Sequence, residues 1–167
     1  VFAMRFSEYR IPSEVKKSLE EMGFKRPTDI QYKAIPSILK GEDVMAIAQT
    51  GTGKTAAFAI PVISLLHNRK RMSAEQEIRC VVMVPTHELA IQITEAFAAI
   101  GKYTRVKTLG LYGGVDQAPQ IEQLEAGVDI LIATPGRLFD LWSQKHVSLK
   151  GLEMLVLDEA DQMLDRG

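Results

Sequence analysis

Residues 44–55 read VMAIAQTGTGKT, and this stretch decides the fold of the chain. The apolar run Val44–Ala48 has the composition of a buried strand, and a helical pattern begins at Lys54 and Thr55. A strand, a glycine-rich turn and a helix, in that order, are the context that a phosphate-binding Walker A loop requires. Ala48 stands where such a loop usually has its first glycine, but alanine is also small. The stretch therefore predicts an α/β fold with a phosphate loop.

The composition of the loop predicts how it would hold a nucleotide. Gly51 and Gly53 lack side chains, so successive backbone N–H groups can face phosphates at the N-terminus of the following helix. We expect Lys54 to reach the β- and γ-phosphates and Thr55 to hold Mg²⁺. A glycine-rich turn that binds nothing would not require Lys and Thr at this spacing. The predicted nucleotide-binding residues of the loop are Gln49, Thr50, Gly51, Thr52, Gly53, Lys54 and Thr55.

A second apolar run, residues 155–157, is followed by the carboxylates Asp158 and Glu159. Asp158 is predicted to orient the hydrated Mg²⁺ ion, and Glu159 to polarise the attacking water as a general base. Two carboxylates after a strand are, by themselves, typical of a helix N-terminus. Together with Lys54 they predict a catalytic set of Glu159, Lys54 and Asp158 for nucleotide hydrolysis.

From Asp43 onward, short β-branched runs alternate with helical patterns, which is typical of a parallel sheet covered by helices on both faces. The predicted strands are Val44–Ala48, Arg79–Val84, Val106–Leu111, Ile130–Thr134 and Met154–Asp158. The predicted helices are Ser13–Met22, Thr28–Leu39, Glu88–Ile100, one that ends near Ala126 and one that starts at Pro135. The polar stretch His67–Glu77 is predicted to be an exposed loop. We therefore expect an α/β fold with a doubly wound, mostly parallel sheet.

The 167 residues suffice for one compact domain, with residues 1–42 as an N-terminal helical extension and 43–167 as the nucleotide-binding part. A helical pattern after Asp161 stops at Gly167, which predicts a truncated C-terminus. Lys and Arg number 20 against 21 Asp and Glu, so no overall charge attracts nucleic acid or membrane. Cys80 is the single cysteine and is expected to be buried in a strand. Without a leader or an apolar run of about 18 residues, we expect a cytoplasmic protein that does not engage membranes. We also expect it to be a monomer.

Residues 158–161 read DEAD, and with the phosphate loop they identify a family: the chain resembles the first RecA-like domain of a DEAD-box RNA helicase, most closely a bacterial member. Residues 23–31, GFKRPTDIQ, resemble the Q motif, which implies recognition of adenine. Gln31 offers a donor and an acceptor to the base, and Phe24 or Arg26 can stack on it. By itself, the same stretch is a capping box in which Gln31 only caps a helix from Thr28.

Three further segments resemble the RNA-gripping motifs of the family: Pro85–Ala90, Gly113-Gly114 and Thr134–Leu138. Helix N-termini and a glycine turn can present backbone N–H groups to phosphates, which implies contact with the RNA backbone and little sequence specificity. His87 stands where the family usually has Arg, and it either faces the RNA or points to solvent from the first turn of its helix. The predicted RNA-binding residues are Thr86, His87, Gly113, Gly114, Thr134 and Arg137.

The resemblance implies an ATP-dependent RNA helicase that uses ATP and Mg²⁺ and needs a second RecA-like domain of the same parent chain. That domain supplies arginines to the ATP site, so the present chain alone is expected to be nearly inactive. Two alternatives stay open. One is another phosphate-loop class, such as a small-molecule kinase, and the other is a non-enzymatic unit that only binds nucleotide and RNA.

Overall fold

The computed structural model describes residues 4–49, 51–72 and 75–165. The chain forms two compact units. The first consists of Val1–Ser73 and Ala96–Arg105, and the second of Ala74–Glu95 and Val106–Gly167. The phosphate-loop stretch belongs to the first unit, and the residues that follow the sheet strands belong to the second.

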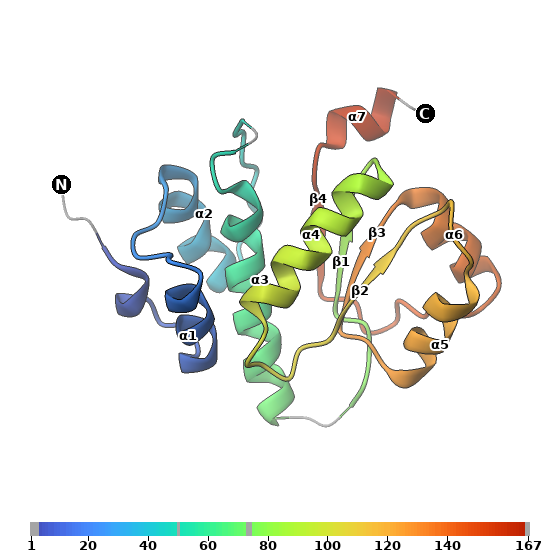
Figure 1. Cartoon of the computed structure of the whole chain (residues 1–167), viewed down its shortest axis with the longest axis horizontal. Coiled ribbons are helices and arrows are strands. Elements are labelled where there is room, and N and C mark those ends of the chain that lie inside the picture. The colour runs from blue at the N-terminus through green and yellow to red at the C-terminus, as the bar shows by residue number, and fades with distance from the viewer. Residues whose placement is uncertain (1–3, 50, 73–74, 166–167) are drawn as a thin grey trace. The chain divides into compact units, whose positions relative to one another are not determined.

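The described part of the first unit is helical, with a 3-10 turn η1 (Phe6–Glu8) before α1 (Ser13–Glu21), α2 (Asp29–Leu39) and α3 (Lys54–Met72) (Figure 1). The predicted helices over Ser13–Met22 and Thr28–Leu39 are thus confirmed. Apolar side chains from these helices and from residues 96–100 are fully buried and form the core of this unit. They include Leu19, Ile35, Ile60, Ile63, Phe97 and Ile100.

Two predictions for the first unit are wrong. The run Val44–Ala48 is not a strand, and its side chains Met45 and Ile47 are 91% and 93% exposed. β-Branched composition favours a strand only where a neighbouring strand supplies hydrogen bonds, and no strand in the described residues pairs with this run. The predicted loop at His67–Glu77 is also partly wrong, because α3 continues to Met72. His67 is buried and accepts a hydrogen bond from the Arg105 backbone N–H, at 3.4 Å.

The second unit contains a parallel sheet of four strands in the order β2-β3-β1-β4, with β1 (Cys80–Met83), β2 (Thr108–Leu111), β3 (Ile130–Ala133) and β4 (Met154–Leu157). Four of the five predicted strands are therefore confirmed. Met83 pairs with both Ala133 and Leu157, and Leu111 pairs with Ala133. All four strands thus end at one level, which we call the carboxyl edge.

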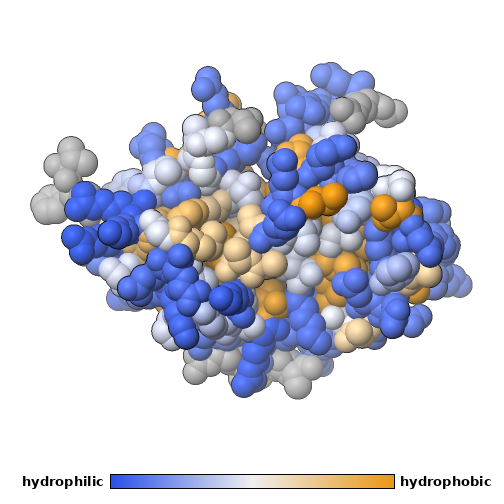
Figure 2. All heavy atoms as spheres, viewed as in Figure 1, coloured by the Kyte–Doolittle hydropathy of each residue, from blue (hydrophilic) through white to orange (hydrophobic). Residues whose placement is uncertain are grey.

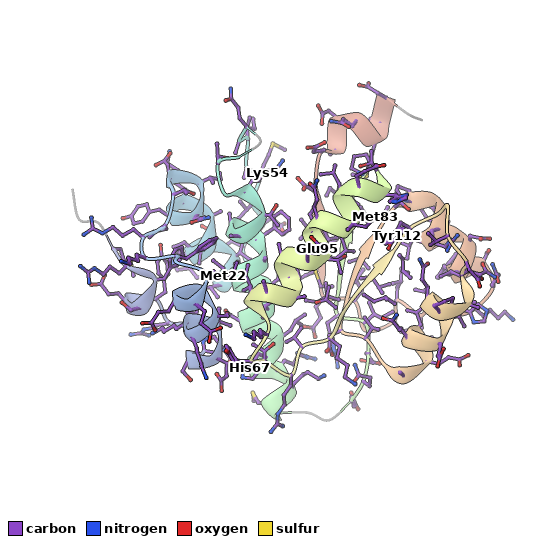
Figure 3. The ribbon with its side chains drawn as sticks, in the orientation of Figure 1. Met22, Lys54, His67, Met83, Glu95 and Tyr112 are labelled. Carbon is purple, nitrogen blue, oxygen red and sulfur yellow. The ribbon has the colours of Figure 1, made fainter. Side chains whose placement is uncertain are left out.

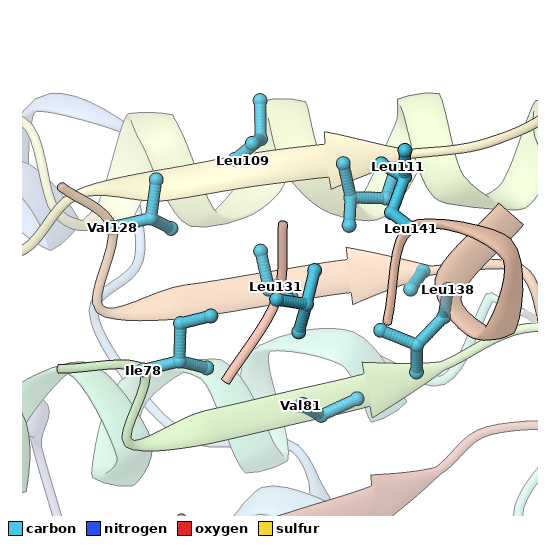
Figure 4. Packing of buried hydrophobic residues seen from close by; sticks show 10 residues of the cluster. Ile78, Val81, Leu109, Leu111, Val128, Leu131, Leu138 and Leu141 are labelled. Atoms are coloured by element: carbon cyan, nitrogen blue, oxygen red, sulfur yellow. The ribbon is translucent and has the colours of Figure 1, made fainter. Parts of the chain in front are cut away.

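Helices cover both faces of this sheet: α4 (His87–Ile100), α5 (Ala118–Ala126) and α6 (Pro135–Ser143), followed by the short α7 (Ala160–Asp165). On one face, Leu138 and Leu141 of α6 pack on Val81, Leu131 and Leu111 (Figure 4). On the opposite face, α4 lies so close to β2 that a Cβ on Gly110 would be 2.9 Å from Thr94 Oγ1. The predicted doubly wound α/β fold is confirmed.

Cys80 lies on β1 and is fully buried, as predicted. Burial disfavours the charged thiolate and raises the pKa of the Cys80 thiol to about 12. No helix within the described residues is both long and apolar enough to cross a membrane. On the face shown in Figure 2, hydrophilic residues break up the hydrophobic surface into separate patches.

Candidate functional site

The phosphate loop has the backbone that its glycines predict. Gly51 and Gly53 have φ of +87° and +81°, in the region that other residues rarely adopt. Thr52 closes the turn, because its backbone N–H and its hydroxyl both donate to the Gln49 carbonyl, at 3.4 and 2.6 Å. Thr50 lies outside the described residues.

Lys54 and Thr55 are the first two residues of α3, a helix of 19 residues (Figure 3 labels Lys54). The first-turn N–H groups and the positive end of the helix dipole therefore lie beside these two side chains. Both residues are half-buried. An ammonium, a hydroxyl and several backbone N–H groups at one helix N-terminus fit a polyphosphate.

Gln31 connects α2 to the phosphate loop. Its side chain is 3% exposed, and its Oε1 accepts a hydrogen bond from the Thr28 backbone N–H at 3.0 Å. Its Nε2 donates to the Gly53 carbonyl, also at 3.0 Å. A Cβ added at Gly53 would collide with this amide, so the close approach requires a glycine there. The capping contact is present, and the same side chain also fixes the loop.

The two candidates for stacking on a base lie just before α2. The Phe24 ring is half-buried and packs against the buried Phe6 ring, with centroids 6.2 Å apart and planes tilted by 31°. The Phe6 backbone N–H donates to the Lys25 carbonyl at 3.1 Å. Arg26 is exposed. Phe24 is therefore held in place by Phe6, whereas Arg26 projects from the surface; stacking on adenine stays a prediction for both.

The acidic motif of the second unit continues directly from β4. The Asp158 side chain is buried, and its backbone N–H donates to the Met83 carbonyl at 3.0 Å, which extends the pairing of β1 and β4. Glu159 is half-buried and has φ of +54°, a left-handed backbone that is unfavourable for residues other than glycine. Such backbone conformations concentrate at functional sites. The turn places two carboxylates in succession at the carboxyl edge, between β4 and α7.

The predicted metal ligands are Thr55 in the first unit and Asp158 in the second. Where the chain is described, no three His, Cys, Asp or Glu side chains cluster in a way that could hold a metal ion. Mg²⁺ prefers oxygen ligands and keeps several waters, so it is usually held by one or two protein groups together with substrate phosphates. The roles of the Thr55 hydroxyl and of the buried Asp158 carboxylate as Mg²⁺ ligands stay predictions.

Two helices begin at the carboxyl edge, each directly after a threonine. The Thr86 hydroxyl accepts a hydrogen bond from the Leu89 backbone N–H, at 3.2 Å, and α4 begins at the next residue. Thr134 is the N-cap of α6 and is followed by Pro135 in the first turn. Its backbone N–H donates to the Leu111 carbonyl, at 2.9 Å. Two helix N-termini are therefore available at this edge for anionic groups.

His87 lies against the double-glycine turn. Its ring stacks on the Tyr112 ring, with centroids 5.0 Å apart and planes 21° apart, and Tyr112 follows β2 directly (Figure 3). Gly114 has φ of +80°, and a Cβ added there would be 3.8 Å from His87 Nδ1. His87 is exposed, but one face of its ring is covered by the Tyr112 ring. Sequence reasoning missed Tyr112, for which the only signal is its position before Gly113.

Arg137 is fixed by two hydrogen bonds. Its Nη1 donates to Gln120 Oε1 and its Nη2 to the Val115 carbonyl, both at 2.9 Å. Gln120 is buried, and its Nε2 donates to the Tyr112 carbonyl at 3.2 Å. Sequence reasoning also missed Gln120, because a single glutamine in an amphipathic helix carries no signal. The segment after β2, α5 and α6 are thereby joined through side chains.

Comparison with known proteins agrees with this arrangement. A family model described as DEAD/DEAH box helicase matches residues 28–167. A Helicobacter pylori (strain B128) protein named DEAD-box ATP-dependent RNA helicase RhpA is 44% identical over 162 residues, which cover 97% of this chain and 32% of that protein. DEAD-box ATP-dependent RNA helicase 30 of Arabidopsis thaliana is 40% identical over 162 residues, covering 97% and 27%.

Two solved structures have the same fold. A DEAD box protein from the hyperthermophile Methanococcus jannaschii aligns with a TM-score of 0.89 at 37% identity, over 100% of this chain and 44% of that one. A hypothetical ATP-dependent RNA helicase from Sulfolobus tokodaii aligns with a TM-score of 0.83 at 38% identity, over 94% and 44%. The chain spans 32% of the length of the Helicobacter pylori relative and 27% of the length of the Arabidopsis thaliana relative.

Proposed function

Because this chain belongs to the DEAD/DEAH box helicase family, we propose that it is the ATP- and RNA-binding N-terminal RecA-like domain of an ATP-dependent RNA helicase. One observation carries the proposal. Asp158 follows β4, while Thr86, Gly113 and Thr134 follow the other strands, and all four strands end at the same carboxyl edge. Ligands of open α/β sheets bind at this edge, so nucleotide chemistry and RNA contact have a common support.

In the proposed reaction, Lys54 and the backbone N–H groups of the phosphate loop bind the β- and γ-phosphates of ATP. Thr55 and Asp158 would hold Mg²⁺, and the ion would offset phosphate charge. Glu159 accepts a proton from the attacking water. The water oxygen forms a bond to the γ-phosphorus, and the bond between the γ-phosphorus and the leaving ADP breaks. Phe24 or Arg26 would stack on adenine, and Gln31 would select the base by exchanging its hydrogen bonds to Thr28 and Gly53 for bonds to adenine.

RNA is proposed to lie along the carboxyl edge. The N-termini of α4 and α6, the double-glycine turn and Arg137 would donate to phosphate oxygens, and His87 would lie beside them. Contacts to the backbone alone imply little sequence specificity. ATP binding would favour gripping and local bending of short duplexes, and hydrolysis would release the RNA.

The wider context is also proposed. The full-length protein would be a cytoplasmic monomer with a second RecA-like domain, which supplies arginines to the ATP site. Residues 1–42 would serve as the extension that carries the Q motif, and residues 43–167 as the RecA-like domain. An arginine finger contributes roughly 10³–10⁵ in rate, so the 167-residue chain alone should bind ATP and hydrolyse it very slowly.

The test is ATP turnover by the full-length protein with and without RNA, next to turnover by the 167-residue chain. The proposal expects RNA-stimulated hydrolysis in the full-length protein only. Transfer of phosphate to a small acceptor would indicate a kinase instead. Binding of nucleotide and RNA without any turnover by the full-length protein would indicate a non-enzymatic module.

A further inference from the structure

We infer that Gln120 is a positioning residue for RNA binding, whose buried amide holds the Arg137 guanidinium and the segment after β2 in one fixed arrangement. The inference rests on the proposed function, since it concerns how tightly the carboxyl edge binds RNA. Gln120 lies in the first half of α5 and is 6% exposed. It is too deeply buried to meet RNA itself, so its effect must pass through its neighbours.

Those neighbours come from two different segments. Gln120 Nε2 donates to the backbone carbonyl of Tyr112, at 3.2 Å, and Gln120 Oε1 accepts from Arg137 Nη1, at 2.9 Å. Arg137 Nη2 in turn donates to the carbonyl of Val115, at 2.9 Å. The double-glycine turn, residues 113–114, lies between the two carbonyls that this network contacts. Both ends of the turn are therefore fixed, one by Gln120 and the other by Arg137.

A glutamine amide matches both of these partners. The Tyr112 carbonyl needs a donor and the Arg137 guanidinium needs an acceptor, and a glutamine side chain provides one of each. A methionine has similar length but would leave a carbonyl and a charged guanidinium facing an apolar group, which is costly for buried polar atoms. The choice of residue type at 120 thus follows from the two partners.

The network also determines how Arg137 can meet a phosphate. A guanidinium has five N–H donors in a planar fork, and the contacts to Gln120 and Val115 use two of them. With its plane fixed by these two bonds, the side chain presents its other donors without losing further rotamer freedom on binding. Tyr112 is positioned by the same amide, and its ring carries the stacked His87.

The experiment is a double-mutant cycle in the full-length protein with Gln120→Met, Arg137→Met and the double variant. Affinity for a fluorescent single-stranded oligouridine is measured across a salt series, and ADP affinity and thermal unfolding are measured alongside. Gln123→Met serves as the matched control, because Gln123 is exposed on the same helix. Gln120→Asn retains the amide but withdraws it by one methylene, in case the methionine variant fails to fold.

We expect Gln120→Met to weaken RNA binding about tenfold, the weight of one charge-assisted hydrogen bond, and to leave ADP affinity unchanged. The slope of log RNA affinity against log salt should fall by up to about 0.7 for Gln120→Met, as we also expect for Arg137→Met, although Gln120→Met removes no charge. When Arg137→Met is already present, adding Gln120→Met should weaken RNA binding little further. Gln120→Asn should act in the same direction.

Equal loss of affinity in both backgrounds, or an unchanged salt slope, would overturn the inference and leave Gln120 with a purely structural role. A loss of ADP affinity that parallels the loss of RNA affinity would also overturn the inference. If the unaltered full-length protein does not bind the oligouridine at all, the proposed function fails first, and the inference falls with it.

Discussion

The Gln31 side chain and the Gly53 carbonyl are joined by a hydrogen bond of 3.0 Å, which links the start of α2 to the phosphate loop. The same amide accepts from the Thr28 backbone N–H, so both of its polar atoms are engaged. Because the side chain is buried, removing it leaves a backbone N–H and a carbonyl without these partners. Gln31, which we propose contacts adenine, and the phosphate loop, which we propose binds the phosphates, therefore hold each other in position.

Gln31→Ala should weaken the binding of both ATP and GTP, because the phosphate loop loses its hydrogen bond to Gln31. It should weaken ATP binding more than GTP binding, because the proposed contact between Gln31 and adenine is also lost. Calorimetric titration of both nucleotides measures the two effects separately. Tyr32→Ala is the control, since Tyr32 is exposed on the same helix. An unchanged ratio of ATP to GTP affinity would mean that Gln31 only caps the helix and holds the loop.

Lys54→Ala should raise the Kd for ATP by at least about tenfold, because one charged donor to the phosphates is lost. Equilibrium binding of a fluorescent ATP analogue measures this change. Lys33→Ala removes the same charge from an exposed pair with Asp29 on α2 and should leave the Kd unchanged. Equal effects of the two substitutions would argue against phosphate contact by Lys54.

Glu159→Gln should preserve ATP binding while lowering ATP turnover of the full-length protein by roughly 10²–10⁴, the usual contribution of a general base. The amide retains the size of the side chain but cannot accept the proton of the attacking water. Steady-state phosphate release in the presence of RNA gives the rate, and nucleotide titration gives the affinity. Turnover that survives the substitution would assign the base to another group.

His87→Arg should strengthen RNA binding at low salt and steepen the slope of log affinity against log salt by up to about 0.7–0.9, because one permanent charge is added beside the backbone. An arginine can keep the stacked position on Tyr112, since guanidinium groups also pack on aromatic rings. Gln92→Arg adds the same charge to an exposed site further along α4 and should change the slope less. Identical slopes for the unaltered protein and both variants would place His87 away from RNA.

Cys80 should resist alkylation by iodoacetamide at pH 8 in the native protein. Its pKa of about 12 means that burial keeps the thiol protonated, and the reactive thiolate is not formed at that pH. Labelling should become rapid only when the sheet unfolds in denaturant, which mass spectrometry over a denaturant series can follow. Fast modification of the folded chain would contradict the burial of β1.

Local patterns predicted most of the helices and strands, since caps such as Thr86 and Thr134 and breaks such as Gly127 act within a few residues. The failures have a common cause. Val44–Ala48 has strand composition but no pairing partner among the described strands. His67, which its polar neighbours assign to a loop, is instead buried on α3 and accepts a hydrogen bond from the Arg105 backbone N–H. Both outcomes depend on tertiary contacts that periodicity does not contain.

The site follows the same rule. Motif spacing selected Asp158 and Arg137 as candidates, because loops after parallel strands meet at one edge, and the Walker A pattern selected Lys54. Neither pattern could show that Gln31 bonds to Gly53 or that Gln120 bonds to Arg137, since these contacts join positions 22 and 17 residues apart. Such contacts depend on how helices dock on the loops.

The left-handed backbone at Glu159, with φ of +54°, has a consequence for selection. A side chain in this region costs about 1 kcal/mol, and glycine is the residue that adopts it freely. Selection for heat resistance alone would therefore replace Glu159 with glycine and gain stability. Under the proposed role of Glu159 as general base, selection for turnover retains the carboxylate, so a lineage that kept the fold but lost the chemistry would be expected to change at this position early.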